Sequence, residues 1–246
     1  MVKLSHGMIW KEIGETPLEA LERFRASKLE LKGEPMTYAG RLDPMAEGQL
    51  LILIGDECKS KAKYLGLDKE YEIGIVFGIS TDTHDALGLA RAADANAVNS
   101  NALKSLDLQK YIGRFSQEYP AFSSKTVNGR QLHELARADE LPEEMPVKEV
   151  EIYSIESLGH ARIAAGALKA HIFSSIDKVK GDFRQAGIKA RWEMILTDPN
   201  RSFECVKIRV KCSSGTYMRS LARMIGEQAG IGAFAVSIKR TKMLGV

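Results

Sequence analysis

The 246-residue chain has few cysteines and no long apolar run. Cys58, Cys205 and Cys212 are widely spaced and form no CxxC pair, which is untypical of a disulfide framework or a zinc ribbon and favours a reducing compartment. The longest unbroken apolar run, 50–54, is far shorter than the ~20 residues that span a bilayer. The first residues lack the apolar core of a signal peptide. We therefore expect a cytoplasmic protein without a membrane span.

The charge is close to balanced, at +3, but it is unevenly distributed. Residues 201–246 contain nine Lys/Arg and two Glu, whereas residues 134–151 contain seven acidic and two basic residues. A dense basic segment favours binding to a polyanion, most often nucleic acid. A solvated strand that carries charge on one face is an equally good interpretation of the composition alone.

Helical and strand patterns alternate irregularly, without a repeat or linker, which favours the α+β class. We expect one domain over 1–246 with a surface insertion at about 160–200, where 174–195 looks helical but shows no clean apolar stripe. Apolar periodicity predicts the other elements. They are a helix from Pro17 capped by Thr16 with Leu18, Leu21 and Phe24 inward, strands at 49–54, 70–77 and 203–211, a helical stretch at 58–65, and a helix at 216–229 that ends at Gly230.

Asp43 lies between a flexible glycine, Gly40, and a rigid proline, Pro44, directly before a buried strand. This context would hold a carboxylate at a fixed place where loops meet a sheet. An Asp-Pro pair is also a common start of an ordinary turn, and spacing alone favours that interpretation.

Two further segments have both a structural and a functional interpretation. Tyr71 begins the alternating strand at 70–77 and by periodicity belongs to the core. The loop at 79–88 contains Thr81, Asp82, Thr83 and Asp85, whose side chains could bond their own backbone. A metal site built from Asp82, His84 and Asp85 lacks a settled ligand spacing.

Arg219 follows a basic strand and falls in the first turn of the predicted helix at 216–229. A cation there opposes the helix dipole, so we expect an anionic partner, although a solvent-facing arginine fits the pattern as well. The chain has no phosphate-binding loop, no HExxH and no histidine pair at metal spacing. Any chemistry should therefore run on carboxylate, tyrosine and arginine, without a cofactor or metal.

Taken together, seven segments resemble the TruB-type tRNA pseudouridine synthases, in order and from about residue 8 to the end except for 160–200. They are GRLDPMAEG at 40–48, LIGDECK at 53–59, KEY at 69–71, TDTHDALG at 81–88, the stretch 120–137, CSSGTYMR at 212–219 and SIKRT at 237–241. Each motif alone is weak, but seven in register are specific.

The resemblance implies an α+β domain with a mixed, mostly antiparallel sheet, flanking helices and a cleft across the sheet. It implies isomerisation of the T-loop uridine of tRNA (uridine-55 in relatives) to pseudouridine, with Asp43 as nucleophile. Arg219 would orient Asp43, and Tyr71 would stack on the uracil or act as a base. The implied substrate-binding residues are Tyr38, Tyr71, Tyr217, Ile238, Asp85, Lys59 and Arg240, and the basic C-terminal segment would supply RNA backbone contacts. We expect a monomer that binds the tRNA T-arm and needs no protein partner.

The chain departs from the family pattern at three places. Tyr38 stands where the family usually has the histidine that helps the RNA present its base. The N-terminal motif appears as KEIGETP from Lys11, without its first proline, and the sequence ends soon after Arg240 and Thr241. We therefore expect no RNA-binding PUA domain.

Two other functions remain open at this stage. Tyr38 in place of histidine is compatible with a tRNA chaperone that has lost useful catalysis. A carboxylate-based nucleoside or glycoside hydrolase would normally need two carboxylates flanking the bond, and the sequence offers one well-placed candidate, Asp43.

Overall fold

The computed structural model describes residues 5–92 and 106–246. The first four residues, on which the expectation about a signal peptide partly depends, lie outside the described residues. The helices are α1 (Pro17–Ser27), α2 (Lys61–Leu65), α4 (Leu132–Ala138), α5 (Ala165–Ile176), α6 (Gln185–Ile195) and α7 (Met218–Gln228), with 3-10 turns η1 (Leu29–Leu31), η2 (Gly55–Ser60) and η4 (Leu108–Tyr111). The strands are β1 (His6–Lys11), β2 (Met36–Ala39), β3 (Ala46–Ile54), β4 (Lys69–Phe77), β5 (Ile79–Thr81), β6 (Ala90–Ala92), β7 (Gly113–Glu118), β8 (Thr126–Val127), β9 (Arg130–Gln131), β10 (Val147–Ala164), β11 (Ser202–Cys212) and β12 (Ala233–Met243).

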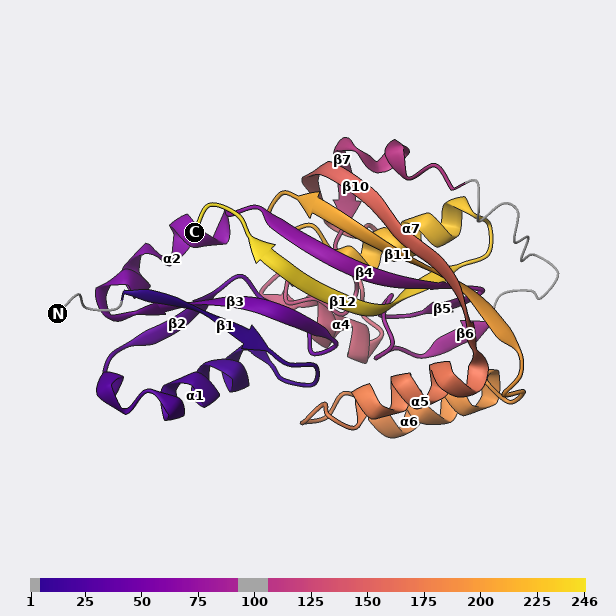
Figure 1. Cartoon of the computed structure of the whole chain (residues 1–246), viewed down its shortest axis with the longest axis horizontal. Coiled ribbons are helices and arrows are strands. Elements are labelled where there is room, and N and C mark those ends of the chain that lie inside the picture. The colour runs from indigo at the N-terminus through magenta and orange to yellow at the C-terminus, as the bar shows by residue number, and fades with distance from the viewer. Residues whose placement is uncertain (1–4, 93–105) are drawn as a thin grey trace.

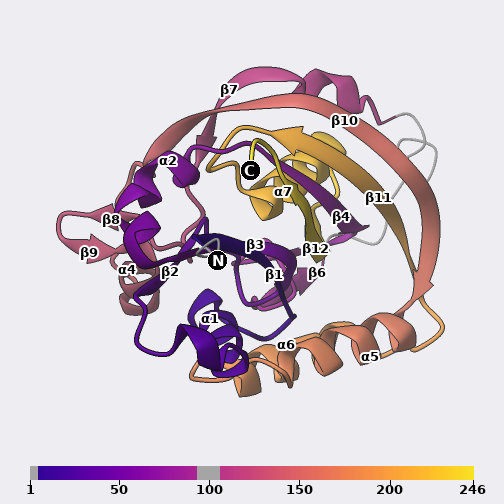
Figure 2. The same ribbon diagram turned by 60° about the vertical axis from the view of Figure 1, so that its left-hand side comes forward.

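An eight-stranded sheet in the order β1-β3-β12-β4-β11-β10-β7, with β2 added beside β3, organises the described residues (Figure 1). Among the described strands, only β12 and β3 pair in parallel; the other pairs of this sheet are antiparallel. The long β10 curves around the molecule as an arc (Figure 2). The predicted α+β class with a mixed, mostly antiparallel sheet is confirmed.

The central strands bury one face under α7, as the alternation predicts. Tyr71, Ile73, Ile75 and Phe77 of β4 join alternate residues of β11 in one core. The helix predicted at 216–229 begins two residues later, at the start of α7. Its end has the expected glycine in a left-handed conformation, Gly230 with φ +71°, which no other residue type adopts as cheaply.

The opposite face of the sheet is covered by α5 and α6, which lie below it in Figure 1. The helical stretch predicted at 174–195 is interrupted in the structure, while the insertion expected at about 160–200 stays a prediction. Residues 160–164 continue β10, and two helices follow, separated by a turn at 177–184. Trp192 is fully buried, and its indole Nε1 donates to the carbonyl of Ala86 at 3.1 Å. Residues 174–195 show no continuous apolar stripe in the sequence because they combine the end of α5, a turn and α6.

Helix α1 begins with the predicted cap. The Thr16 hydroxyl accepts from the Glu19 N–H at 3.2 Å, and the Glu19 carboxylate accepts from the Thr16 N–H at 2.7 Å. The predicted inward position of Leu21 is confirmed, whereas that of Leu18 is wrong: Leu18 is 55% exposed, and Ala20 is buried on the inner face. The stretch predicted as helical at 58–65 is the end of η2 followed by the short α2. None of the described helices is long and apolar enough to cross a membrane.

Replacing Thr16 with alanine should lower the free energy of unfolding by about 1 kcal/mol, because the first turn of α1 loses its side-chain cap. Urea denaturation of the variant and the wild type measures this difference. Thr126→Ala is the matched control, since Thr126 is exposed on β8 and its loss should change stability by less than about 0.5 kcal/mol. Equal stability of both variants would contradict a contribution from the cap.

Candidate active site

Asp43 lies in the turn between β2 and β3, and the main chain of this turn is fixed by contacts on both sides. The Ala46 N–H donates to the Asp43 carbonyl at 3.0 Å, and the Gly14 N–H donates to the Pro44 carbonyl at 2.8 Å. The buried Lys11 donates its Nζ to the Ala46 carbonyl at 2.5 Å. The Asp43 side chain is 37% exposed and lines a cavity of about 600 Å³. A carboxylate is thus held in a defined place yet open to a ligand.

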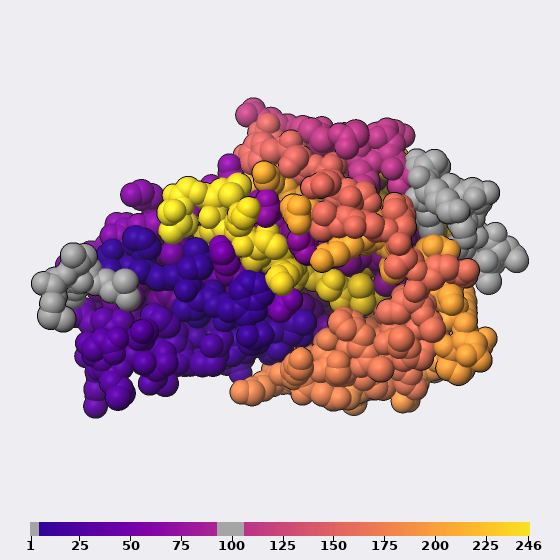
Figure 3. All heavy atoms as spheres, viewed as in Figure 1, coloured from indigo at the N-terminus to yellow at the C-terminus, as the bar shows by residue number. Residues whose placement is uncertain are grey.

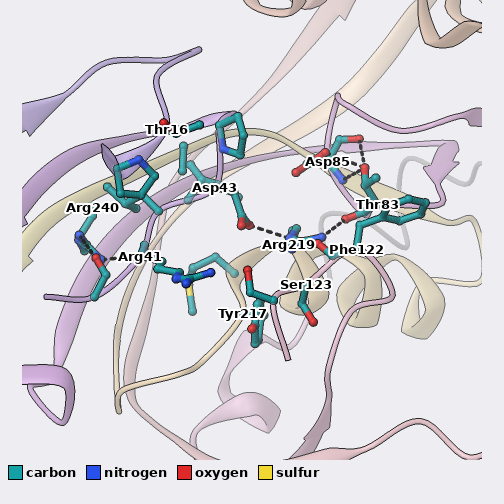
Figure 4. Close-up of a pocket in the computed structure, with 18 of the residues that line it drawn as sticks. Thr16, Arg41, Asp43, Thr83, Asp85, Phe122, Ser123, Tyr217, Arg219 and Arg240 are labelled. Carbon is teal, nitrogen blue, oxygen red and sulfur yellow. Dashed lines mark hydrogen bonds and ion pairs between the residues drawn. The ribbon is translucent and has the colours of Figure 1, made fainter. Parts of the chain in front are cut away.

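Arg219 is the partner of the Asp43 carboxylate. It is almost fully buried, with 3% of its side chain exposed. Its Nε donates to Asp43 Oδ2 at 2.8 Å, its Nη1 to the Thr83 carbonyl at 3.0 Å and its Nη2 to the Phe122 carbonyl at 2.9 Å (Figure 4). Burial by itself would lower the pKa of Arg219. The negative charges of Asp43 and Asp85 have the larger effect, so the pKa of Arg219 is raised. The guanidinium therefore stays charged and fixes the carboxylate in one orientation.

The sheet register brings residues of three strands beside Asp43. Ile238 of β12 lies opposite Ala46 of β3 on one side and Ile73 of β4 on the other. Two residues further, Arg240 lies opposite Tyr71. Tyr71 and Ile238 both line the cavity that Asp43 lines. Tyr71 is buried, and burial raises the pKa of its phenol, so its ring is a neutral wall of the site.

Arg240 fixes the chain just before Asp43. Its guanidinium, nearly inaccessible to solvent, donates to the carbonyls of Gln49 at 2.6 Å, Arg41 at 3.2 Å and Gly40 at 3.2 Å. Gly48 allows this approach of β3 and β12: a Cβ there would lie 2.2 Å from the Arg240 carbonyl oxygen, and its φ is +124°. These three bonds to main-chain carbonyls make Arg240 part of the scaffold of the site.

Asp85 lies in the self-bonded loop that the sequence suggests. Its Oδ1 accepts from the Thr83 hydroxyl at 2.7 Å and from the Leu87 N–H at 2.9 Å. Because Thr83 also binds Arg219 through its carbonyl, this loop is tied to the Asp43 pair. Burial raises the pKa of the Asp85 carboxyl to about 6.

The pKa of Asp85 predicts a pH-dependent cost in stability. Its ordinary value is 3.8 and its folded value about 6, so the folded state holds the proton more tightly. The cost is negligible below about pH 3, grows as the pH rises to about 6 and is nearly constant above about pH 7. One pKa unit corresponds to about 1.4 kcal/mol, so the free energy of unfolding of Asp85→Asn relative to wild type should rise by about 3 kcal/mol between about pH 3 and about pH 7.

Urea denaturation of Asp85→Asn and wild type at intervals across this range measures that difference. Asp56→Asn is the control, because the Asp56 side chain is 95% exposed. A stability difference for Asp85→Asn that is the same at every pH would contradict a raised pKa.

The residues weighed as metal ligands are used otherwise. Asp82 pairs with Arg184, Nη1 to Oδ2 at 3.0 Å. His84 is partly buried, and the loss of solvent around its imidazole lowers its pKa to about 3. Within 5–92 and 106–246, no group of three or more His, Cys, Asp or Glu side chains is placed to hold a metal ion.

Tyr38 and Tyr217 are far apart in the sequence but line the same cavity. Lys61 places its Nζ 5.0 Å from the centre of the Tyr38 ring. The main chain of Tyr217 is clamped by Gln117, whose amide accepts from its N–H at 2.8 Å and donates to its carbonyl at 3.2 Å. The Tyr119 ring packs edge-on against the Tyr217 ring. Both cavity tyrosines thus present aromatic surface near Asp43.

Lys59 is placed away from this cavity. Its side chain is 83% exposed and pairs with Asp56 on η2. The basic residues of β11 are also placed elsewhere: Lys207 and Arg209 lie on the sheet face opposite Tyr71 and pair with Glu72. Glu72 therefore neutralises part of the basic C-terminal segment, and contact between that segment and an RNA backbone stays a prediction.

The positive charge of the cavity comes from basic residues of several segments, in addition to Arg219 and Arg240. The additional basic lining residues are Arg41, Lys69, Arg137, Lys148 and Arg184. The carbonyls of Thr83 and Phe122 were missed, since any residue type supplies a carbonyl and no sequence pattern marks them. Arg41, Lys69 and Arg137 lie within segments that resemble the family motifs, whereas no pattern in the sequence marks Lys148 or Arg184.

The chain is similar in sequence to named enzymes. It is 32% identical over 223 residues to a tRNA pseudouridine synthase B of Xanthomonas axonopodis pv. citri, covering 91% of this chain and 59% of that protein. It is 30% identical over 236 residues to the tRNA pseudouridine synthase B of Aquifex aeolicus, covering 96% and 67%. The chain thus spans about three fifths to two thirds of the length of these relatives.

Solved structures share the fold. The chain matches a protein in the crystal structure of a Cbf5-Nop10-Gar1 complex with a TM-score of 0.57 and 19% identity, over 97% of this chain and 48% of that one. It matches a protein in an H/ACA RNP bound to a substrate RNA containing 2'-deoxyuridine with a TM-score of 0.53 and 17% identity, over 97% and 47%. The family described as TruB family pseudouridylate synthase (N terminal domain) matches residues 28–175, more than half of the sequence. The chain therefore belongs to the TruB family of pseudouridylate synthases.

Proposed function

We propose that this chain is a tRNA pseudouridine synthase that isomerises the T-loop uridine of tRNA, with Asp43 as the nucleophile. The observation that carries the proposal is the pair of Asp43 and Arg219: one carboxylate open to a cavity, oriented by one buried guanidinium. The names of the TruB relatives support tRNA as the substrate.

The reaction needs only groups that this site contains. In uridine, the bond between N1 of the base and C1′ of the ribose breaks, and C1′ is rejoined to C5 of the same uracil. The Asp43 carboxylate attacks C1′ as uracil leaves with the bonding electron pair, and carboxylate attack of this kind is established covalent catalysis. After the uracil turns, its C5 attacks C1′, the carboxylate is released, C5 loses its proton and N1 gains one. Atoms and electrons balance without an oxidant or reductant.

Tyr71 supports the step in which the detached uracil must be retained. Its buried ring lines the cavity beside Asp43 and offers a stacking surface for the base. The raised pKa of its phenol disfavours the phenolate, so stacking is the better supported role than general base. Ile238 adds an apolar contact on the adjacent strand.

The cavity suits a nucleotide turned out of an RNA loop. Single-stranded RNA loops are recognised through splayed bases that stack on aromatic side chains, and Tyr38 and Tyr217 provide such surfaces here. Turning a base out costs a few kcal/mol, which contacts between phosphates and basic lining residues such as Arg41 and Lys148 can offset. Tyr38, at the position of the family histidine, would take part by stacking.

Tritium release from tRNA labelled at C5 of uridine tests the proposal, because rearrangement at C5 must expel that hydrogen. We expect release by the wild type in the presence of EDTA and, on mapping the product, pseudouridine in the T-loop. Release from another position would overturn the T-loop assignment. Free uracil as the product would identify a hydrolase, and tight, salt-sensitive binding of tRNA without any release would identify a tRNA chaperone.

A further inference from the structure

The turn between α5 and α6, residues 177–184, reaches the cavity although both helices cover the opposite sheet face. Phe183 and Arg184 line the cavity. In Figure 3 the tip of this hairpin extends toward the N-terminal part of the molecule; there, a Cβ on Gly14 would lie 2.5 Å from Lys178. The turn thus connects the layer of α5 and α6 to the cavity that Asp43 lines.

The turn is held by its own side chains and by α4. Gln185 donates its Nε2 to the carbonyls of Gly181 at 2.7 Å and Val179 at 3.2 Å. Arg137 of α4 donates to the Asp182 carbonyl at 2.6 Å. Arg184 follows with a φ of +62°, a left-handed conformation that costs energy for a side chain of this size. Such an anchored turn can hold a side chain in one place.

At the end of this turn, Arg184 contacts two different loops. Its Nη1 donates to Asp82 Oδ2 at 3.0 Å, and its guanidinium carbon lies 4.2 Å from the centre of the Phe122 ring. A guanidinium over an aromatic face is attracted to it, while its edge remains free to bind a carboxylate. A single side chain therefore joins the loop that contains Asp82 to the loop that contains Phe122.

These two loops are the ones that hold Arg219. The Phe122 carbonyl accepts from Arg219 Nη2 at 2.9 Å. The Thr83 carbonyl, directly after Asp82, accepts from Arg219 Nη1 at 3.0 Å. Arg219 in turn binds Asp43. A fixed spacing between the two carbonyls is required for Arg219 to keep both bonds and direct its Nε at the carboxylate.

We propose that Arg184 is a positioning residue: by joining Asp82 to Phe122 it fixes the two carbonyls that hold Arg219, and thereby the orientation of Asp43. The expected effect of Arg184 on the reaction rate rests on the proposed synthase function. The expected effect of Arg184 on the position of Arg219 does not. The competing role is direct contact of Arg184 with an RNA phosphate, since 30% of its side chain is exposed.

Steady-state tritium release at varied tRNA concentration separates the two roles. We expect Arg184→Gln to lower kcat roughly 10- to 100-fold, since small misplacements of reacting groups have effects of this size, with KM within about twofold of wild type. Lys189→Gln is the matched control on the same hairpin, because Lys189 pairs with Asp177 and does not line the cavity. A raised KM at unchanged kcat, recovered by Arg184→Lys, would instead establish a phosphate contact and overturn the proposal.

The Nε–H resonance of Arg219 gives a readout that needs no activity. It is assigned by its absence in Arg219→Lys, and its exchange with solvent reports how firmly the guanidinium is held. We expect Arg184→Gln, but not Lys189→Gln, to accelerate this exchange roughly tenfold or more. If Arg184→Gln does not fold, Asp82→Asn carries the same test from the other end of the pair. Unchanged exchange would overturn the positioning role, whereas accelerated exchange in an enzyme that never releases tritium would overturn only the synthase function.

Discussion

Asp43→Asn should lower the rate of tritium release at least about a thousandfold, because an amide cannot attack C1′ and removal of a nucleophile is among the costliest changes to an active site. The fold should be kept. The asparagine Oδ1 can still accept from Arg219 Nε, which replaces a charge-assisted bond by a neutral one and should lower the free energy of unfolding by about 1 kcal/mol. Asp85 remains close enough to offset part of the uncompensated charge of Arg219.

Three measurements check this result: tritium release, tRNA binding by gel shift, and urea denaturation. Binding should be equal to that of the wild type or slightly tighter, since a negative charge is removed from a site for a polyanion. Asp56→Asn serves as the control for loss of an exposed aspartate. A variant of Asp43 that retains more than a small fraction of the wild-type rate would refute its role as nucleophile.

Arg219→Lys has the second largest expected effect, and it acts on activity and stability together. An ammonium cannot reproduce three bonds that diverge from one planar guanidinium, so at least one of the Thr83 and Phe122 carbonyls loses its donor while buried. Burial also lowers the pKa of a lysine at this place. We expect a roughly 100-fold lower rate and a free energy of unfolding lower by about 2–4 kcal/mol.

The same release assay and urea denaturation measure both effects. Arg223→Lys is the control on α7, because Arg223 lies one turn later and pairs with Glu118 and Glu227 near the surface. Its stability should stay within about 1 kcal/mol of wild type. If the Arg219→Lys variant were as active and as stable as this control, the planar guanidinium of Arg219 would not be needed.

The local parts of the fold are visible in the sequence. The alternation along β4 and β11, the cap at Thr16 and the glycine at the end of α7 depend on neighbours a few residues away, so periodicity and capping rules predict them. The same reasoning predicts that Arg219 needs an anionic partner. That the partner is Asp43, 176 residues away, could come only from the resemblance.

The non-local parts could not be predicted. The position of β12 between β3 and β4 depends on which strands pair, and that order decides which charges face one another. Lys207 and Arg209 therefore looked free in the sequence but meet Glu72 in the sheet. The role of Arg184 depends on a turn between two helices and on a ring and a carboxylate far away in the sequence, for which no local pattern exists.

The strand order also has a consequence for biosynthesis. β3 and β4 do not pair with each other, because β12 lies between them, and β12 leaves the ribosome after every other described strand. Until then the growing chain exposes two apolar strand edges, which favours association with other chains. Arg240, which fixes the loop before Asp43, belongs to that same last strand. We therefore expect the nascent polypeptide to complete the cavity around Asp43 only after synthesis has passed β12, and to gain from any shielding of its open edges in the interval.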